Sequence, residues 1–108
     1  MKRKQQRQQA QFSEAKSKKI SEEQLYEQIL TLCVEAGPES YIRPEDVAMS
    51  LSDEWQGLLG RIRIAAKKLA QGGAVVILRK GKPADPDDFK GVYRLRIATA
   101  ENRYVTEE

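Results

Sequence analysis

Histidine is absent from this chain of 108 residues, and cysteine occurs once, at Cys33. Without histidine, the chain lacks the commonest general base and the commonest metal ligand of proteins. A single cysteine forms no intramolecular disulfide, and without histidine beside it the usual zinc-binding sets are excluded. The glycines also fit neither the dinucleotide-binding fingerprint nor the P-loop. We therefore expect no enzyme, no bound metal and no cofactor, and we infer no small-molecule substrate.

Long apolar runs are missing as well, although the apolar fraction of 40% is ordinary for a soluble domain. No stretch reaches the length of a membrane span, and no secretory signal is recognisable. The sequence therefore predicts a cytoplasmic protein that does not enter a membrane. Between the polar ends, roughly 80 residues remain, which is enough for one modest core.

The two ends of the chain differ from the middle in composition. Residues 1–19 hold seven basic residues against Glu14 and are rich in glutamine. Such a segment buries too little apolar surface to order itself, so we predict a disordered basic arm. This arm either follows phosphates or only adds solubility. Residues 99–108 are predicted to form a polar tail, which leaves residues 20–98 as the folded domain.

Two helices are predicted in the first half of this domain. Ser21 is a suitable N-cap, and Gln24 three residues later completes a capping box. Apolar residues then recur at helical spacing and include Cys33, which is expected to be a buried, inert thiol. Gly37-Pro38 ends this helix. Pro44 fits the first position of a second helix of about two turns.

A third and longer helix is predicted from about Asp53 to Gln71. Its apolar stripe consists of Trp55, Leu58, Leu59, Ile62, Ala65, Ala66 and Leu69. Trp55 is expected in the core, with a role as an interface anchor as the alternative. Gly57 and Gly60 each cost about 1 kcal/mol relative to alanine inside a helix. They permit a close backbone approach, either to a partner or to the second helix.

Two strands follow, "AVVILR" and "VYRLRI". In the second strand, Arg94 and Arg96 alternate with apolar residues, so that one face is cationic. The connecting loop is long, and Asp85 to Gly91 has the pattern of a single helical turn. Its aspartates could hold a cation or act as an acid–base pair, but their place in a loop with proline favours turn capping. The fold class is therefore mainly α with a small antiparallel β-hairpin (α+β).

Charge is divided sharply between the two halves of the domain. Residues 55–96 contain ten basic residues against three acids, a net charge of +7. Residues 20–54 contain Arg43 against nine acids, a net charge of −8. A domain with this division has a directed electrostatic field, which steers charged partners.

The element order, three helices plus a wing, is that of the winged helix-turn-helix. Two phrases add to this: "IRPEDVA" followed by "DEW", and "KGKPADP" followed by "GVYRLR". Together they resemble a family of small bacterial proteins with a winged-helix domain of unknown function. The resemblance runs from about Ser21 to Ile97. It supports the fold and implies no activity, ligand or functional residue.

The leading hypothesis is a winged helix that binds double-stranded DNA. The predicted contacts are Arg61, Arg63, Lys67 and Lys68 on the third helix and Arg94 and Arg96 on the wing. A helix in the major groove uses such residues for phosphates and base edges. Two features oppose the hypothesis: Asp53-Glu54 begins the predicted helix, and three aspartates lie in the wing, where they would meet phosphate.

Two other interpretations remain open. Long helices commonly carry a solvated charged face that binds nothing, and cations near a helix C-terminus stabilise its dipole. Alternatively, the domain is a protein-interaction module whose acidic and basic halves recognise complementary surfaces, including those of a second copy. Ile64 favours a protein partner, because DNA binding does not require an apolar residue on the outer side of the helix.

Overall fold

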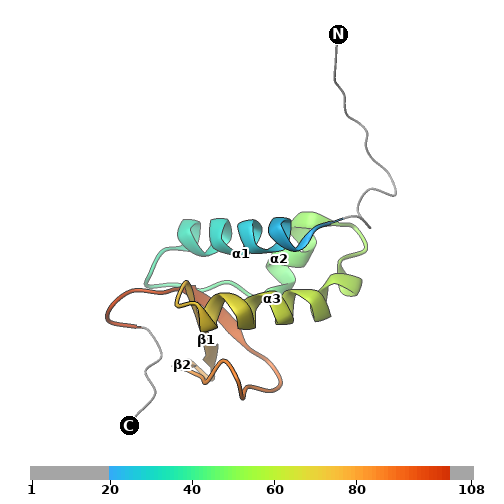
Figure 1. The fold of residues 1–108 in the computed structure, drawn as a ribbon. Coiled ribbons are helices and arrows are strands. Elements are labelled where there is room, and N and C mark those ends of the chain that lie inside the picture. Colours follow the sequence, from blue (N-terminus) through green and yellow to red (C-terminus); the bar gives the residue numbers. More distant parts are fainter. Residues whose placement is uncertain (1–19, 103–108) are drawn as a thin grey trace.

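The computed structural model describes residues 20–102, and the predicted basic arm and residues 103–108 lie outside this range. The described chain forms three helices and a small antiparallel sheet, an α+β fold (Figure 1). α1 (Glu22–Ala36) and α3 (Leu59–Gln71) lie side by side. The strands of the sheet come after α3 in the sequence. The predicted fold class is confirmed, with a sheet of three strands where a two-stranded hairpin was expected.

α1 begins and ends where the sequence predicted. The Ser21 hydroxyl accepts a hydrogen bond from the Gln24 amide (3.1 Å), and the Gln24 side chain accepts one from the Ser21 amide (2.9 Å). These bonds satisfy two donors that a helix start leaves without partners. At the other end, Gly37 has a φ of 90° and donates to the last carbonyls of the helix. A residue with a side chain rarely adopts this φ, so glycine is required here.

The predicted third helix is divided into two segments. α2 (Pro44–Leu51) is followed by a turn, then by the 3₁₀ segment η2 (Trp55–Leu58), and only then by α3. Asp53 and Glu54 therefore lie in a turn before the helix, and the expected start of the helix at Asp53 is wrong. Gly57 lies in the 3₁₀ segment, where it disfavours an α-helical turn by about 1 kcal/mol relative to alanine.

The sheet has the strand order β2-β1-β3. β1 (Val75–Arg79) turns tightly into β2 (Lys82–Pro83) through Lys80 and Gly81, both at positive φ (56° and 82°). Two consecutive positive φ values are typical of the I′ turn that suits a two-residue hairpin. β3 (Arg94–Ile97) pairs with the other edge of β1. The wing therefore ends in a cationic turn, and a loop from Ala84 to Tyr93 returns the chain to β3.

A single bridge adds the segment before α2 to this sheet. Ile42 and Leu95 exchange two backbone hydrogen bonds of 2.8 and 2.9 Å. The short extended segment predicted before Pro44 thus lies against the free edge of β3. A short first strand paired with the last one is consistent with a winged-helix-like arrangement.

One hydrophobic core joins all three helices to the sheet. Cys33 is fully buried in it, as predicted, and Trp55 packs against it partly buried. The largest fully buried side chains are Leu25, Ile29, Ile62, Ile77, Leu78, Leu95, Val47, Val76 and Cys33. Among residues 20–102, no helix combines the length and the apolar character that a membrane crossing requires.

Candidate nucleic-acid interface

α3 buries one side and leaves three of the four predicted cations exposed on the others. Ile62, Ala65 and Ala66 face the core. Arg61, Lys67 and Lys68 are exposed. Helical geometry places Ile64 opposite the buried side, and 56% of its side chain is exposed. The outermost line of α3 is therefore apolar at its centre and cationic at its flanks.

Arg63, the fourth predicted cation of this helix, is half-buried and has partners within the chain. Its guanidinium donates to the carbonyl oxygens of Phe89 (2.7 Å) and Gly91 (3.3 Å). The same group lies 4.4 Å from the centroid of the Phe89 ring and 5.1 Å from that of Tyr93. Arg63 thus ties the loop before β3 to α3, and its hydrogen-bonding capacity is directed inward.

Arg79 holds the same loop from β1. Its Nη1 donates to the Val92 carbonyl at 2.6 Å, and its guanidinium lies against Gly91. A side chain at Gly91 would be 3.5 Å from that guanidinium, and the φ of 76° at Gly91 itself disfavours any other residue. Two arginines, from α3 and from β1, therefore fix three carbonyls between Phe89 and Val92.

The loop aspartates lie beside the C-terminal half of α3. Asp87 accepts a hydrogen bond of 2.6 Å from the Gln71 side chain. Asp85 accepts one of 2.9 Å from the Asp87 amide, which is the predicted turn capping. The segment forms a turn, and the predicted single helical turn from Asp85 to Gly91 is wrong. Local side-chain-to-backbone bonds of this kind compete with helix formation.

Gly57 and Gly60 have open space where a side chain would be. A Cβ built on either residue meets no atom within 4 Å. Close packing against α2, one of the two explanations considered for these glycines, is therefore excluded. The bare backbone at the start of α3 faces outward beside Arg61 and Ile64.

Arg94 and Arg96, the two predicted cations of the wing, belong to a different surface. They line a hollow of about 560 Å³ on the face of the sheet opposite the core, which we call the outer-face hollow. Its lining residues are Tyr41, Leu78, Arg79, Lys80, Gly81, Gly91, Val92, Tyr93, Arg94 and Arg96. Four cations and no acid line it, whereas Lys67 shares its surroundings with Asp87.

The arrangement of cations around the hollow was only partly visible in the sequence. Arg94 and Arg96 follow from strand alternation. Arg79 and Tyr41 were not predicted as site residues, because their positions depend on the tight Lys80-Gly81 turn and on the Ile42 bridge. A Lys-Gly pair directly after an apolar run is the available signal for the turn.

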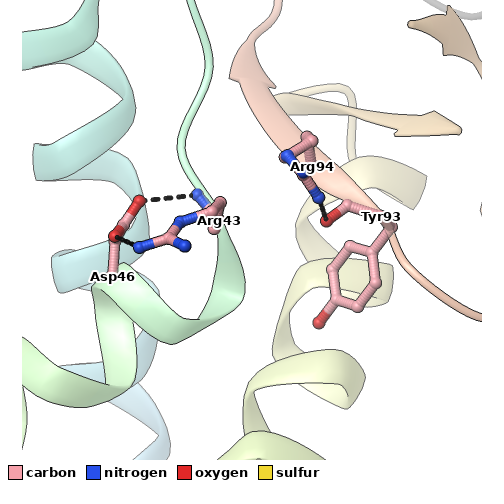
Figure 2. Close-up of polar contacts among 4 residues, drawn as sticks. All are labelled: Arg43, Asp46, Tyr93 and Arg94. Carbon is pink, nitrogen blue, oxygen red and sulfur yellow. Dashed lines mark hydrogen bonds and ion pairs between the residues drawn. The ribbon is translucent and has the colours of Figure 1, made fainter. Parts of the chain in front are cut away.

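The acid whose charge interacts with Arg94 already has a partner. Asp46 accepts hydrogen bonds from the Arg43 amide and from the Arg43 guanidinium, both at 2.9 Å (Figure 2). The side-chain hydrogen bond from Arg43 lowers the pKa of Asp46, with smaller contributions from the charges of Arg43 and Arg94. The same bond raises the pKa of Arg43. Asp46 therefore stays ionised and is largely neutralised by its partner.

Two titratable side chains of the domain, Cys33 and Tyr93, are buried. Burial raises the pKa of the Cys33 thiol to about 12, so it is a poor nucleophile at neutral pH. Burial also raises the pKa of Tyr93 to about 12, against the opposing charge of Arg63. The Tyr93 ring points away from Arg94 (Figure 2), and its buried hydroxyl has no hydrogen-bond partner. Within residues 20–102, no three acidic or thiol side chains converge in a group that could hold a metal ion.

The fold and the surfaces define a class: a small α+β domain with a winged-helix-like arrangement, exposed cations on α3 and partly buried arginines on the outer face of its sheet. Comparison of the sequence with family models gives a more particular assignment. The chain belongs to the family described as "Protein of unknown function (DUF3253)", whose model matches residues 22–98. That span contains all three helices and the sheet. A search of curated proteins found no match.

Proposed function

We propose that this domain is a winged helix that binds double-stranded DNA through α3 and the turn of the wing, without catalysing a reaction. The observation that supports this best is the position of the acids. α3 begins at Leu59 and has no acid in its first turn, because Asp53 and Glu54 precede it. The wing turns at Lys80-Gly81, and the aspartates lie further along the loop. The first turn of α3 and the turn of the wing therefore carry no acid, while Asp87 lies beside Lys67 further along α3.

The cations available for such contact are exposed. Arg61, Lys67 and Lys68 flank the outer line of α3, Lys80 lies in the hairpin turn and Lys82 begins β2. The bare backbone at Gly60 admits a close approach to a groove. We assign Arg63 a supporting role, since its bonds hold the loop that connects α3 to the wing. Phosphate contacts of this kind position a protein on the duplex, and base contacts add specificity.

Binding is tested by fluorescence anisotropy of the full chain with a random duplex at a series of salt concentrations. If about six phosphates are neutralised, log affinity falls with log salt at a slope near −5. The double variant Lys67→Gln with Lys68→Gln should reduce that slope by about 2, since each phosphate contact contributes about 1. Lys2→Gln with Lys4→Gln makes the same charge change in the arm and measures the arm's own share. An unchanged slope in the α3 variant would refute the proposal.

One observation favours a protein partner as the second candidate. Ile64 lies at the centre of the outer line of α3 with 56% of its side chain exposed, next to the open Gly60. A partner helix or strand would cover these residues. The alternative in which the acidic and basic halves pair between two copies predicts self-association that weakens with salt. Sedimentation of the full chain at low and high salt measures this, and a monomer under both conditions removes the self-association version.

A further inference from the structure

The outer-face hollow combines charge with an absence of competing acids. Arg79, Lys80, Arg94 and Arg96 line it, and no carboxylate does. Within residues 20–102, none of these four cations forms a salt bridge, and Asp46 is engaged by Arg43. A group of cations without neutralising partners repels itself, and an anion at the centre relieves that repulsion.

Three arginines of the hollow are held in place by backbone carbonyls. Arg79 donates to Val92 (2.6 Å), Arg96 to Ser40 (2.8 Å) and Arg94 to Tyr93 (3.4 Å). A guanidinium has five N–H donors, so one such bond leaves most of them for a ligand. Because the anchoring bonds already restrict the side chains, less rotamer entropy is lost when an anion binds.

The hollow also has an aromatic side and room for more than an inorganic ion. Tyr41 is 50% exposed, and the Arg94 guanidinium lies 5.7 Å from the centroid of its ring. The exposed Val92 adds apolar surface. A volume of about 560 Å³ falls in the range of small-molecule sites. A planar ring stacks well on tyrosine or on a guanidinium, and a phosphate accepts bidentate bonds from arginine.

From these features we propose that the outer-face hollow binds a nucleotide, with the phosphate on Arg94 and Arg96 and the base against Tyr41. The nucleotide is either free or one unit of a single strand, since both present the same phosphate and planar base. This site shares Lys80 with the proposed duplex-binding surface, but none of the α3 cations lines it. The nucleotide proposal therefore holds whether or not a duplex binds to α3.

An acidic peptide is the competing ligand, because carboxylates also bind arginine. It lacks a planar ring next to its anionic group, and it therefore leaves Tyr41 unused. Selectivity for a nucleotide over a glutamate-rich peptide and over inorganic phosphate separates these possibilities.

The test is a titration of the isotope-labelled full chain followed by amide NMR. The probes are inorganic phosphate, adenosine monophosphate, a short oligothymidylate and a hexaglutamate peptide. The expected shifts occur at Tyr41, at residues 79–81 and at residues 91–96. Base stacking should make adenosine monophosphate bind roughly 10-fold more tightly than phosphate. If only the oligothymidylate shifts these residues, the ligand is a single strand, and if both shift them, the site accepts the free nucleotide as well.

Variants assign the interaction to the named side chains. Arg94→Gln with Arg96→Gln should weaken nucleotide binding at least roughly 10-fold, the cost of one good charge-assisted pair. Arg61→Gln with Lys67→Gln removes the same charge from α3 and should change nucleotide affinity less than about twofold, because neither residue lines the hollow and salt screens exposed charges. Tyr41→Leu should reduce the affinity for adenosine monophosphate to that for phosphate. This variant leaves the arginines in place, so it tests the site even if the arginine variant is destabilised.

The proposal is overturned if adenosine monophosphate and the oligothymidylate leave the hollow's amides unshifted, or if hexaglutamate binds more tightly than either. It is also overturned if the Arg94 and Arg96 variant and the Arg61 and Lys67 variant weaken nucleotide binding equally. If Arg61→Gln with Lys67→Gln abolishes duplex binding but retains nucleotide binding, the result supports a nucleotide site in the outer-face hollow. Loss of nucleotide binding alone, in the Arg94 and Arg96 variant, would leave the duplex proposal intact.

Discussion

The apolar side chains on both faces of the small sheet are buried, but the surroundings of the two faces differ. On the inner face, Ile77 packs into the core between the helices and is 1% exposed. On the outer face, Leu78 is 2% exposed although it lies outside that core. Its cross-strand neighbour is Arg94, just as Val76 has Arg96 opposite it. Long arginine stems cover apolar surface while the charged group stays in water.

This difference explains why β1 is a continuous apolar run. A strand covered on one face alternates, whereas a strand covered on both faces is apolar throughout. It also shows that the number of cations in a segment does not measure its capacity to bind. Arg94 and Arg96, which lie opposite Leu78 and Val76 in the sheet, each use one donor within the chain, while Arg63 uses two donors to hold the loop.

The largest expected effect is a loss of stability when a buried side chain on either face of the sheet is shortened. Ile77→Ala should lower the free energy of unfolding by about 2–5 kcal/mol, because the packed helices cannot fill the cavity. Leu78→Ala removes equally buried atoms, yet it should cost at least about 1 kcal/mol less, since Leu78 borders the hollow and lies outside the packed core of the helices. Urea denaturation of both variants gives the comparison. Equal losses would show that the outer face is packed as rigidly as the inner one.

Arg63→Ala is the second test, and it concerns the loop that borders the hollow. The variant loses two charge-assisted hydrogen bonds and the contact with Phe89, so we expect a loss of about 2 kcal/mol. Arg61→Ala, at an exposed position on the same helix, should stay within about 0.5 kcal/mol of the parent chain. Thermal or urea unfolding distinguishes them. A similar small effect for both would mean that Arg63 is a surface cation like its neighbour.

Much of the fold could be predicted because its signals are local. The capping box at Ser21, the glycine after α1 and the proline that begins α2 each lie within a few residues of the boundary they set. The alternation in "VYRLRI" predicted a cationic face in the same way. The fold class follows from these signals in order along the chain.

The rest depended on contacts between distant residues. Helical spacing alone predicts that Arg63 is an exposed cation on the surface of the helix. Its actual role depends on the Phe89 carbonyl, which is 26 residues away in the sequence. The hollow requires the Ile42 bridge to bring Tyr41 next to β3. The start of α3 at Leu59 depends on a balance of two free energies. Gly57 disfavours a helical turn, whereas burial of Trp55 and Leu58 against the core favours an ordered one. No local pattern decides such a balance.

Gly60→Ala compares the α3 surface with the outer-face hollow. Gly60 is helical, its φ is not positive, and an added Cβ meets nothing, so the substitution should stabilise the domain by about 0.4–1 kcal/mol. If a duplex approaches the backbone here, the same substitution should weaken duplex binding and leave the hollow's nucleotide affinity unchanged. Urea denaturation and the two binding assays measure these effects. Greater stability with unchanged duplex affinity would remove Gly60 from the contact surface.

The smallest expected effect comes from the acid beside the outer face. Arg43 lowers the pKa of Asp46, so the folded state favours the ionised carboxylate. The stabilisation is therefore present above the unfolded pKa of about 3.9 and is lost as the pH falls through the lower folded value. Both side chains are substantially exposed, at 49% and 37%, so solvent screening keeps the effect small. Asp46→Asn should lower the urea midpoint slightly at pH 7 and flatten its decline below about pH 4. Because the same carboxylate also interacts with Arg94, the variant should strengthen phosphate binding in the hollow while it weakens the fold. If phosphate affinity and the urea midpoint both decrease, Asp46 contributes more by holding the local structure than it opposes phosphate binding by its negative charge.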